Sequence, residues 1–166
     1  MSSMPLHVLF LCTGNSARSL IAEGVLRKLG QDQFRAYSAG SQPTGTPNPY
    51  ALIVLQDHDI DVDFAASKRW DVFAGDDAPE MDLIVTVCDN AAGETCPVWP
   101  GHPKVAHWGV ADPAAIDGSH DRIIAGFQTT YEEMSSRIRA LIAGHPTAET
   151  IGDLARSIGQ SEAGQS

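Results

Sequence analysis

The chain opens with the pattern of a buried strand that stops at a turn-rich loop and passes directly into a helix. The nearly continuous apolar run Leu6–Leu11 is followed by Cys12–Ser16, a cluster of small and polar residues. Apolar residues then recur at helical spacing from Leu20 to Leu29, and Gly30 stands where a helix commonly stops. Because a continuous apolar run is typical of a strand in a parallel sheet, the sequence predicts the strand–loop–helix unit of an α/β fold.

Further strand and helix patterns alternate along the chain. We expect strands over 34–37, 81–87 and 105–108, and helices over 50–56 and within 116–142. This alternation favours a parallel sheet, since a parallel crossover usually contains a helix. The expected fold class is therefore α/β, with a four-stranded parallel sheet in a three-layer α/β/α arrangement. Ligands of such sheets bind beyond the carboxyl ends of the strands, where Cys12 and Cys88 both fall.

The chain has 166 residues, which suffices for one domain with a sizeable core but not for two ordinary ones. We expect one domain over 1–145 and a tail over 146–166 that is mobile or forms a short helix. Lys and Arg number 11 and Asp and Glu 21, so the net charge is −10, which disfavours nucleic acids and anionic membranes as partners. The apolar runs are far shorter than the roughly 20 residues of a membrane span. We expect a cytoplasmic protein, and a monomer.

The loop after the first strand carries a pattern suited to binding and attacking an oxyanion. Cys12 and Arg18 are separated by five residues and lie between a strand and a helix. This spacing lets backbone N–H groups converge on one centre, while Arg18 can hold two oxygens of a tetrahedral anion. The helix dipole and the Ser19 hydroxyl would favour a thiolate nucleophile at Cys12. The expected oxyanion-binding residues are Thr13, Gly14, Asn15, Ser16, Ala17, Arg18 and Ser19. The alternative is a buried structural cysteine beside a surface arginine.

The three cysteines, Cys12, Cys88 and Cys96, are an odd number, which does not suit the disulfide framework of a secreted protein. A catalytic, redox or metal-binding role has to be considered instead. A structural zinc site would normally need four ligands at closer spacing than that of Cys88 and Cys96, although His102 and His107 lie nearby in the sequence. We therefore expect no metal site and no bound cofactor.

These motifs resemble the low-molecular-weight protein tyrosine phosphatase superfamily and, within it, the arsenate reductase branch. The superfamily's phosphate loop is Cys, five residues, Arg, then Ser or Thr, as in Cys12–Ser19. The resemblance to the superfamily is carried by Val8–Ser19, Ala22–Gly24 and Ser38–Gly40. The resemblance to the reductase branch is carried by Asn15, Asp82–Cys88, Cys96–Pro97, His107–Gly109 and Asp112–Ala114. It covers approximately residues 6–143 and implies a low-molecular-weight tyrosine phosphatase-like fold.

The resemblance implies that the chain reduces arsenate to arsenite with a relay of three thiols. Cys12 would attack arsenate, Cys88 would attack Cys12 as arsenite leaves, and Cys96 would attack Cys88. Thioredoxin or a glutaredoxin-like partner would then supply electrons by reducing the Cys88–Cys96 disulfide. Phosphate and sulfate would be competing oxyanions. The alternatives are a low-molecular-weight phosphatase that hydrolyses phosphomonoesters through a phosphocysteine, and a catalytically idle anion-binding module.

Asp112, directly before Pro113, matches the aspartate that protonates the leaving oxygen in the superfamily. The expected catalytic residues are therefore Cys12, Arg18, Cys88, Cys96 and Asp112. Phosphatases of the superfamily that act on tyrosine usually carry aromatic residues after this Asp-Pro pair, whereas this chain has Ala114 and Ala115. An aryl substrate would find little to stack on, which favours the reductase. A simple Asp-Pro turn is the alternative.

A last set of residues is expected to support the phosphate loop. Some members of the reductase branch bind potassium there, and Asn15, Glu23 and Ser38 match three of the ligand positions. The remaining ligands align near Ala66 and Lys68, where this chain has no oxygen side chain. We expect Lys68 to replace the cation electrostatically by pairing with Glu23. The alternative is that Lys68 is a solvated surface lysine.

Overall fold

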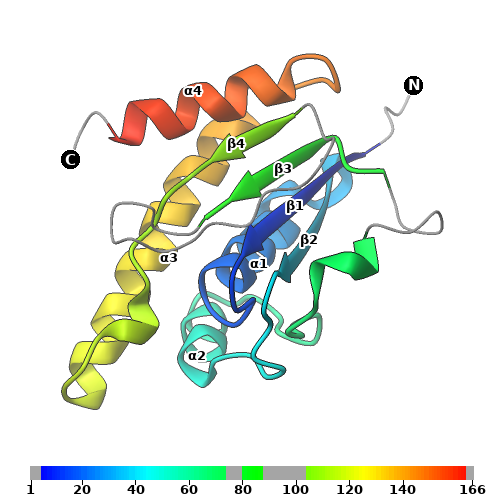
Figure 1. Ribbon diagram of the computed structural model, residues 1–166. Helices are drawn as coiled ribbons and strands as arrows, with labels where there is room; N and C mark the ends of the chain where they lie inside the picture. Colours follow the sequence, from blue (N-terminus) through cyan, green and yellow to red (C-terminus); the bar gives the residue numbers. More distant parts are fainter. Residues whose placement is uncertain (1–4, 74–79, 88–103, 164–166) are drawn as a thin grey trace.

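The computed structural model describes residues 5–73, 80–87 and 104–163. It contains a four-stranded sheet in the order β2-β1-β3-β4 (Figure 1). The strands are β1 (Leu6–Cys12), β2 (Phe34–Gly40), β3 (Leu83–Thr86) and β4 (Val105–His107). Every neighbouring pair is parallel, so the expected α/β fold with a four-stranded parallel sheet is confirmed.

The register of the central strand brings the carboxyl ends of its neighbours to one level. Cys12 lies opposite Gly40 of β2, and Leu11 lies opposite Thr86 of β3. β2 is longer than the sequence predicts, because it pairs with β1 along its full length. β3 begins later than predicted, since Asp82 closes the start of the strand with its side chain, which accepts the N–H of His7 at 2.8 Å.

The helices are α1 (Arg18–Gly30), α2 (Pro49–Asp57), α3 (His120–Ala143) and α4 (Ile151–Ala163). Two of them begin at a side-chain cap: the Asn48 side chain accepts the N–H of Tyr50 at 2.9 Å, and Ser119 accepts that of Arg122 at 3.2 Å. Proline at the first position of α2 suits a helix start, because its fixed φ is helical and it needs no N–H partner there. Within the described ranges, no helix is both long and apolar enough to cross a membrane.

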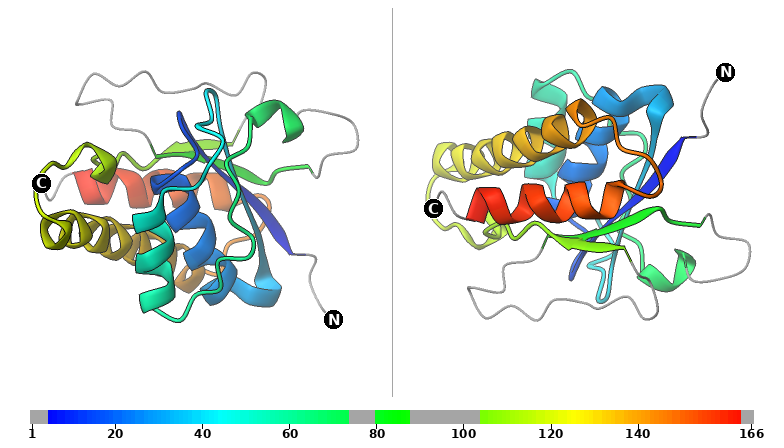
Figure 2. Two further views of the ribbon diagram at one scale, coloured as in Figure 1. Left: turned by 90° about the horizontal axis from the view of Figure 1, so that it is seen from below. Right: turned by 90° about the horizontal axis from the view of Figure 1, so that it is seen from above.

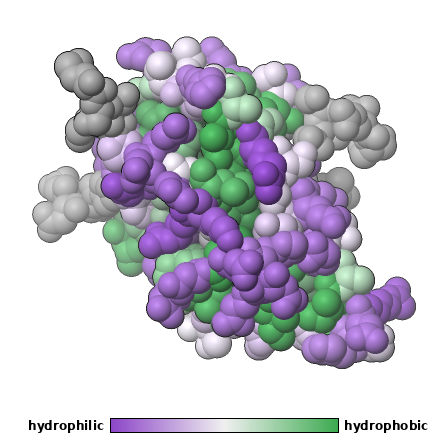
Figure 3. Space-filling model, turned by 180° about the vertical axis from the view of Figure 1, so that it is seen from behind, coloured by the Kyte–Doolittle hydropathy of each residue, from purple (hydrophilic) through white to green (hydrophobic). Residues whose placement is uncertain are grey.

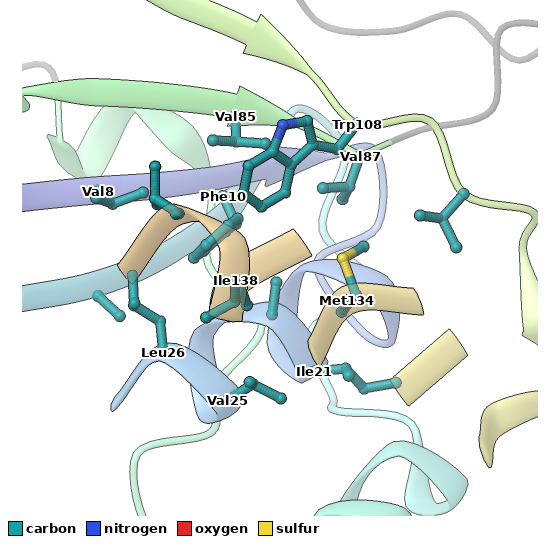
Figure 4. Packing of buried hydrophobic residues seen from close by; sticks show 14 of the residues in the cluster. Val8, Phe10, Ile21, Val25, Leu26, Val85, Val87, Trp108, Met134 and Ile138 are labelled. Carbon is teal, nitrogen blue, oxygen red and sulfur yellow. The ribbon is translucent and has the colours of Figure 1, made fainter. Parts of the chain in front are cut away.

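The helices α1 to α4 pack against one face of the sheet and enclose the main hydrophobic core (Figure 2). In Figure 4, Phe10 of β1 and Trp108, which follows β4, face Ile21 of α1 and Ile138 of α3. The opposite face carries a smaller cluster of Leu9, Leu11, Ala39, Met81 and Ile84. Among the described residues, this face is covered by the short 3₁₀ helix Trp70–Phe73 and its neighbours. The layer on this face of the sheet is thus thinner than the layer that α1 to α4 form on the other face.

The segment for which a mobile tail or a short helix was expected forms α4, which lies along β4. Ile151, Ala155 and Ile158 of α4 join the main core. The buried Trp108, next to β4, donates its indole N–H to the carbonyl of Ala155 at 2.9 Å. Residue 145 therefore does not mark the end of the packed core.

Candidate active site

The predicted oxyanion loop lies at the carboxyl end of the central strand. Cys12 is the last residue of β1, Arg18 is the first residue of α1, and residues 13–17 connect them. The side chain of Arg18 is 6% exposed and Cys12 is 2% exposed, so the cysteine and arginine lie inside the protein rather than on its surface. This burial contradicts the alternative in which Arg18 is a surface side chain.

The carbonyl groups of the loop are held away from its centre. Those of Cys12, Thr13, Gly14 and Ser16 accept hydrogen bonds from backbone N–H groups of the segment 41–48 at 2.8 to 3.2 Å. In a trans peptide the N–H of the next residue points the opposite way from the carbonyl. The N–H groups that follow these carbonyls therefore face the interior of the loop, as the oxyanion-binding expectation requires.

The sulfur of Cys12 is surrounded by hydrogen-bond donors. The backbone N–H of Asn15 donates to it at 3.3 Å, and the Ser19 hydroxyl lies 2.9 Å away. The Ser19 oxygen itself accepts a hydrogen bond from the Asn15 side-chain amide at 2.9 Å. Its own proton is then free to point at the sulfur. Two donors therefore lie at the Cys12 sulfur, where they would stabilise a thiolate, the nucleophilic form of cysteine.

Asn15 and Gly40 give the loop its shape. Asn15 has φ 46, a left-handed conformation that asparagine tolerates better than most residues. Its side-chain oxygen accepts the backbone N–H of Lys68 at 2.7 Å, which ties the loop to a distant segment. A Cβ on Gly40 would meet the carbonyl oxygen of Thr13 at 2.4 Å, so only glycine lets β2 approach the loop this closely.

The N-terminus of α1 supplies further positive potential. Ala17 stands at the cap position, where no side chain of the described residues makes a capping hydrogen bond, and the first turn contains no acidic residue. The first N–H groups of a helix have no partner within it and carry the positive end of its dipole. An anion bound in the loop would meet these groups.

The structure brings Asp112 to the same site. The Asp112 carboxylate lies 3.8 Å from the guanidinium of Arg18, and its side chain is 42% exposed. Arg18 also donates to the carbonyl of Val110 at 3.1 Å, which holds the chain near Asp112. A carboxyl group at the open rim of an oxyanion loop can deliver a proton to a leaving oxygen.

The predicted support residues meet beneath the loop. The Ser38 hydroxyl donates to the buried carboxylate of Glu23 at 2.5 Å, and Arg27 lies 3.6 Å from the same carboxylate. Burial raises the pKa of Glu23, while the Ser38 hydrogen bond and the charges of Lys68 and Arg27 oppose this rise. Burial lowers the pKa of Lys68, and the charge of Glu23 opposes that shift. Lys68 is partly buried, and its ammonium group donates to the carbonyl of Ala66 at 2.7 Å. No ion pair joins Lys68 to Glu23 among the described residues, so the expected pairing of the two stays a prediction.

Cys88 and Cys96, expected to be the second and third thiols, lie outside the described residues. The last described residue before them is Val87, whose N–H donates to the carbonyl of Leu11 at 3.0 Å. Val87 therefore lies next to the end of β1.

Sequence reasoning missed the segment 41–48 and Gly40 as parts of the site. The segment acts through its backbone, so its side chains carry no direct signal. Gly40 does carry one, because a glycine that ends a strand next to a reactive loop often allows a close backbone approach.

Comparison with known proteins adds a family to this geometry. Residues 7–152 match the family described as low molecular weight phosphotyrosine protein phosphatase. The arsenate reductase of Bacillus subtilis is 38% identical over 132 residues, which is 80% of this chain and 91% of that protein. The crystal structure of arsenate reductase from Archaeoglobus fulgidus superposes with a TM-score of 0.66 at 27% identity, covering 82% of this chain and 98% of that one. A thioredoxin-dependent arsenate reductase of Corynebacterium glutamicum superposes with a TM-score of 0.61 at 26% identity, covering 87% of this chain and 63% of that one.

Proposed function

Because this chain belongs to the low molecular weight phosphotyrosine protein phosphatase family, and because it matches arsenate reductases over 80% of its length, we propose that it reduces arsenate to arsenite. The observation that carries the proposal is the buried Cys12 sulfur in a loop of inward N–H groups beside Arg18. The loop alone would also suit a phosphatase. The level of identity to the reductases favours arsenate.

In the first step the loop N–H groups and Arg18 hold the arsenate oxygens while the Cys12 thiolate attacks arsenic. A bond forms between sulfur and arsenic, and one oxygen leaves as water after it receives a proton from Asp112. The contacts of Arg18 with Asp112 and with the carbonyl of Val110 support these two roles, since they keep the proton donor next to the arginine that binds the anion.

In the second step the Cys88 thiolate attacks the Cys12 sulfur. The sulfur–arsenic bond breaks and its electron pair stays on arsenic, which leaves as arsenite while a Cys12–Cys88 disulfide forms. Cys96 then attacks Cys88, which releases Cys12 as a thiolate and leaves a Cys88–Cys96 disulfide. A thioredoxin-like dithiol returns the two electrons, and the thioredoxin-dependent relative from Corynebacterium glutamicum supports this class of reductant. Phosphate and sulfate compete with arsenate, because they are tetrahedral anions too.

The test is an arsenate-dependent assay with thioredoxin, thioredoxin reductase and NADPH. We expect the wild type to form arsenite and consume NADPH, and Cys12→Ser and Cys88→Ser to do neither. If wild type consumes NADPH no faster than Cys88→Ser, the relay is wrong. Rapid hydrolysis of an aryl phosphate by the same preparation would then identify a phosphatase. Replacing thioredoxin by glutaredoxin and glutathione identifies the class of reductant.

We also propose that Lys68 takes the place of a potassium ion under the loop. Its ammonium group donates to the carbonyl of Ala66 at 2.7 Å and its charge acts on the buried Glu23, so a potassium ion there would meet a positive charge. We expect the rate and the melting temperature of the wild type to be equal in KCl and NaCl at constant ionic strength. A strong rise of either in KCl would contradict the proposal, and Lys68→Met serves as the comparison in which the ammonium is missing.

A further inference from the structure

We propose that Arg137 is a positioning residue for Asp112, which it serves by holding the backbone just before it. Arg137 lies on α3, outside the phosphate loop, and is 8% exposed. Its guanidinium donates to the carbonyl of Gly109 at 3.3 Å. Gly109 and Val110 lead from β4 to Asp112, so this contact acts on the segment that carries the acid. The inference rests on the proposed function, in which Asp112 protonates the leaving oxygen.

Two helices hold two consecutive carbonyls of this segment. Arg137 of α3 donates to Gly109, and Arg18 of α1 donates to Val110 at 3.1 Å. On the far side of Asp112, the 3₁₀ helix Pro113–Ala115 lies against α3. The backbone is therefore anchored on both sides of the acid. Asp112 itself is 42% exposed on its side chain, so its place depends on the anchored backbone together with its ion pair to Arg18 at 3.8 Å.

The surroundings of Arg137 argue against a purely structural role. Among the described residues, no carboxylate forms an ion pair with it, and its Nε is buried without a hydrogen-bond partner. Burying an unpaired guanidinium is unfavourable, and an apolar side chain of similar size often stabilises such a position. A role in positioning explains why a poorly satisfied cation lies here. This role predicts two different effects of removing the Arg137 charge. The stability of the fold should not fall, whereas Asp112 should be held less firmly in position.

The expected loss is in the chemical step. A displacement of about 1 Å in a reacting group can cost about a hundredfold in rate, so we expect Arg137→Met to lower the rate of arsenite formation by about tenfold to a hundredfold. The arsenate KM should change little, because within the described chain the Arg137 guanidinium donates to the carbonyl of Gly109 and not to the loop that binds the anion.

The experiment measures single-turnover arsenite formation, KM and melting temperature for the wild type and for Arg137→Met, with Arg139→Met as the matched control. Arg139 is an exposed arginine two residues further along the same helix. Asp112→Asn and the double variant Asp112→Asn/Arg137→Met complete the set. We expect Arg137→Met to form arsenite more slowly than the wild type and to have an unchanged or higher melting temperature. The double variant should form arsenite no more slowly than Asp112→Asn alone. Arg137→Lys, which keeps one charged donor, should recover part of the rate and replaces Arg137→Met if that variant does not fold.

The outcomes separate the inference from the proposed function. If the wild type forms no arsenite, or if Asp112→Asn is as fast as the wild type, the proposed function or its acid is wrong. If Asp112→Asn is slow but Arg137→Met is as fast as Arg139→Met, the inference is wrong. It is equally wrong if Arg137→Met slows the Asp112→Asn variant by the full factor seen in the wild type, since Arg137 would then act independently of Asp112.

Discussion

At the scale of single residues, Asn15 contributes most to the shape of the candidate site. It is fully buried and has a left-handed backbone. Its side chain donates to Ser19 and accepts from the backbone of Lys68. Asn15 therefore links the thiol's neighbour, the loop and the segment that carries the supporting lysine. The sequence pattern marked Asn15 as a candidate, but this linking role depends on contacts with residues far along the chain.

Two substitutions at Asn15 separate its side-chain bonds from its backbone conformation. Asn15→Gly keeps the left-handed conformation without strain and loses the hydrogen bonds, which we expect to cost about 1 to 3 kcal/mol. Asn15→Ala loses the same bonds and also meets the left-handed strain of about 1 kcal/mol or more. Urea unfolding should therefore rank the variants as wild type, Asn15→Gly and Asn15→Ala in order of falling stability. An alanine variant as stable as the glycine variant would contradict the role of the backbone.

Glu23 predicts a pH dependence of stability. Burial raises the pKa of Glu23 above the ordinary value of 4.5, so the folded state keeps the Glu23 carboxyl protonated to higher pH than the unfolded chain does. The contribution of Glu23 to the free energy of unfolding is thus fully present below pH 4.5 and falls as pH rises through the folded-state pKa. Glu23→Gln has no carboxyl group at this position, so it does not lose stability in this way as pH rises. The free energy of unfolding of Glu23→Gln minus that of the wild type should therefore grow as pH rises from about 4 towards 7.

Chemical unfolding of both proteins across this pH range measures that difference. Glu133→Gln, at an exposed position of α3, is the control and should show no comparable trend. A difference that stays constant, or that shrinks with rising pH, would contradict this prediction. It would show that Ser38, Lys68 and Arg27 lower the pKa of Glu23 by at least as much as burial raises it.

At the scale of elements, the close approach of α4 to β4 depends on a glycine. A Cβ on Gly159 would meet the carbonyl oxygen of His107 at 2.5 Å and the ring of Trp108 at 3.0 Å. A Cβ on Gly152 of the same helix would meet only the side chains of Arg156 and Lys104, at 3.3 Å or more. The two glycines therefore offer a matched pair, since one faces a rigid backbone and the other faces flexible side chains.

We expect Gly159→Ala to destabilise the protein by about 1 to 3 kcal/mol, because α4 has to move away from β4. Gly152→Ala should be neutral or stabilise by up to about 1 kcal/mol through helix propensity. Thermal unfolding monitored by tryptophan fluorescence measures the stability of both variants. Equal melting temperatures for the two variants would mean that α4 does not rest closely on β4.

The elements also show what a sequence can predict. Local patterns sufficed for the four strands, for α1 to α3 and for the oxyanion loop, because apolar periodicity and turn residues are local signals. The strand limits were less well predicted, since the end of β2 depends on pairing with β1 and the start of β3 on the contact of Asp82 with His7. The role of the segment 41–48 and of Arg137 could not be predicted, because both act on backbone carbonyls that only the fold brings near.

At the scale of the whole molecule, an acidic protein presents a small positive site to an anion. The net charge is −10, yet the site combines Arg18, the inward N–H groups and the start of α1. The helical face seen from behind in Figure 3 is mostly hydrophilic and is crossed by a band of hydrophobic residues. Among the described residues, only Ile53 and Val72 are large hydrophobic side chains that are exposed. The anion is therefore expected to be recognised by the local field of the loop and not by the charge of the whole surface.

The central claim is that Cys12 starts a reduction of arsenate in which the protein itself supplies both electrons. The most direct measurement mixes fully reduced protein, freed of external thiols, with arsenate and determines arsenite and free thiols after one turnover. The account predicts about one arsenite per chain together with the loss of about two thiols, and neither change in Cys12→Ser. Reduced wild type that forms no arsenite, or whose thiol count stays unchanged while an aryl phosphate is hydrolysed, would contradict it.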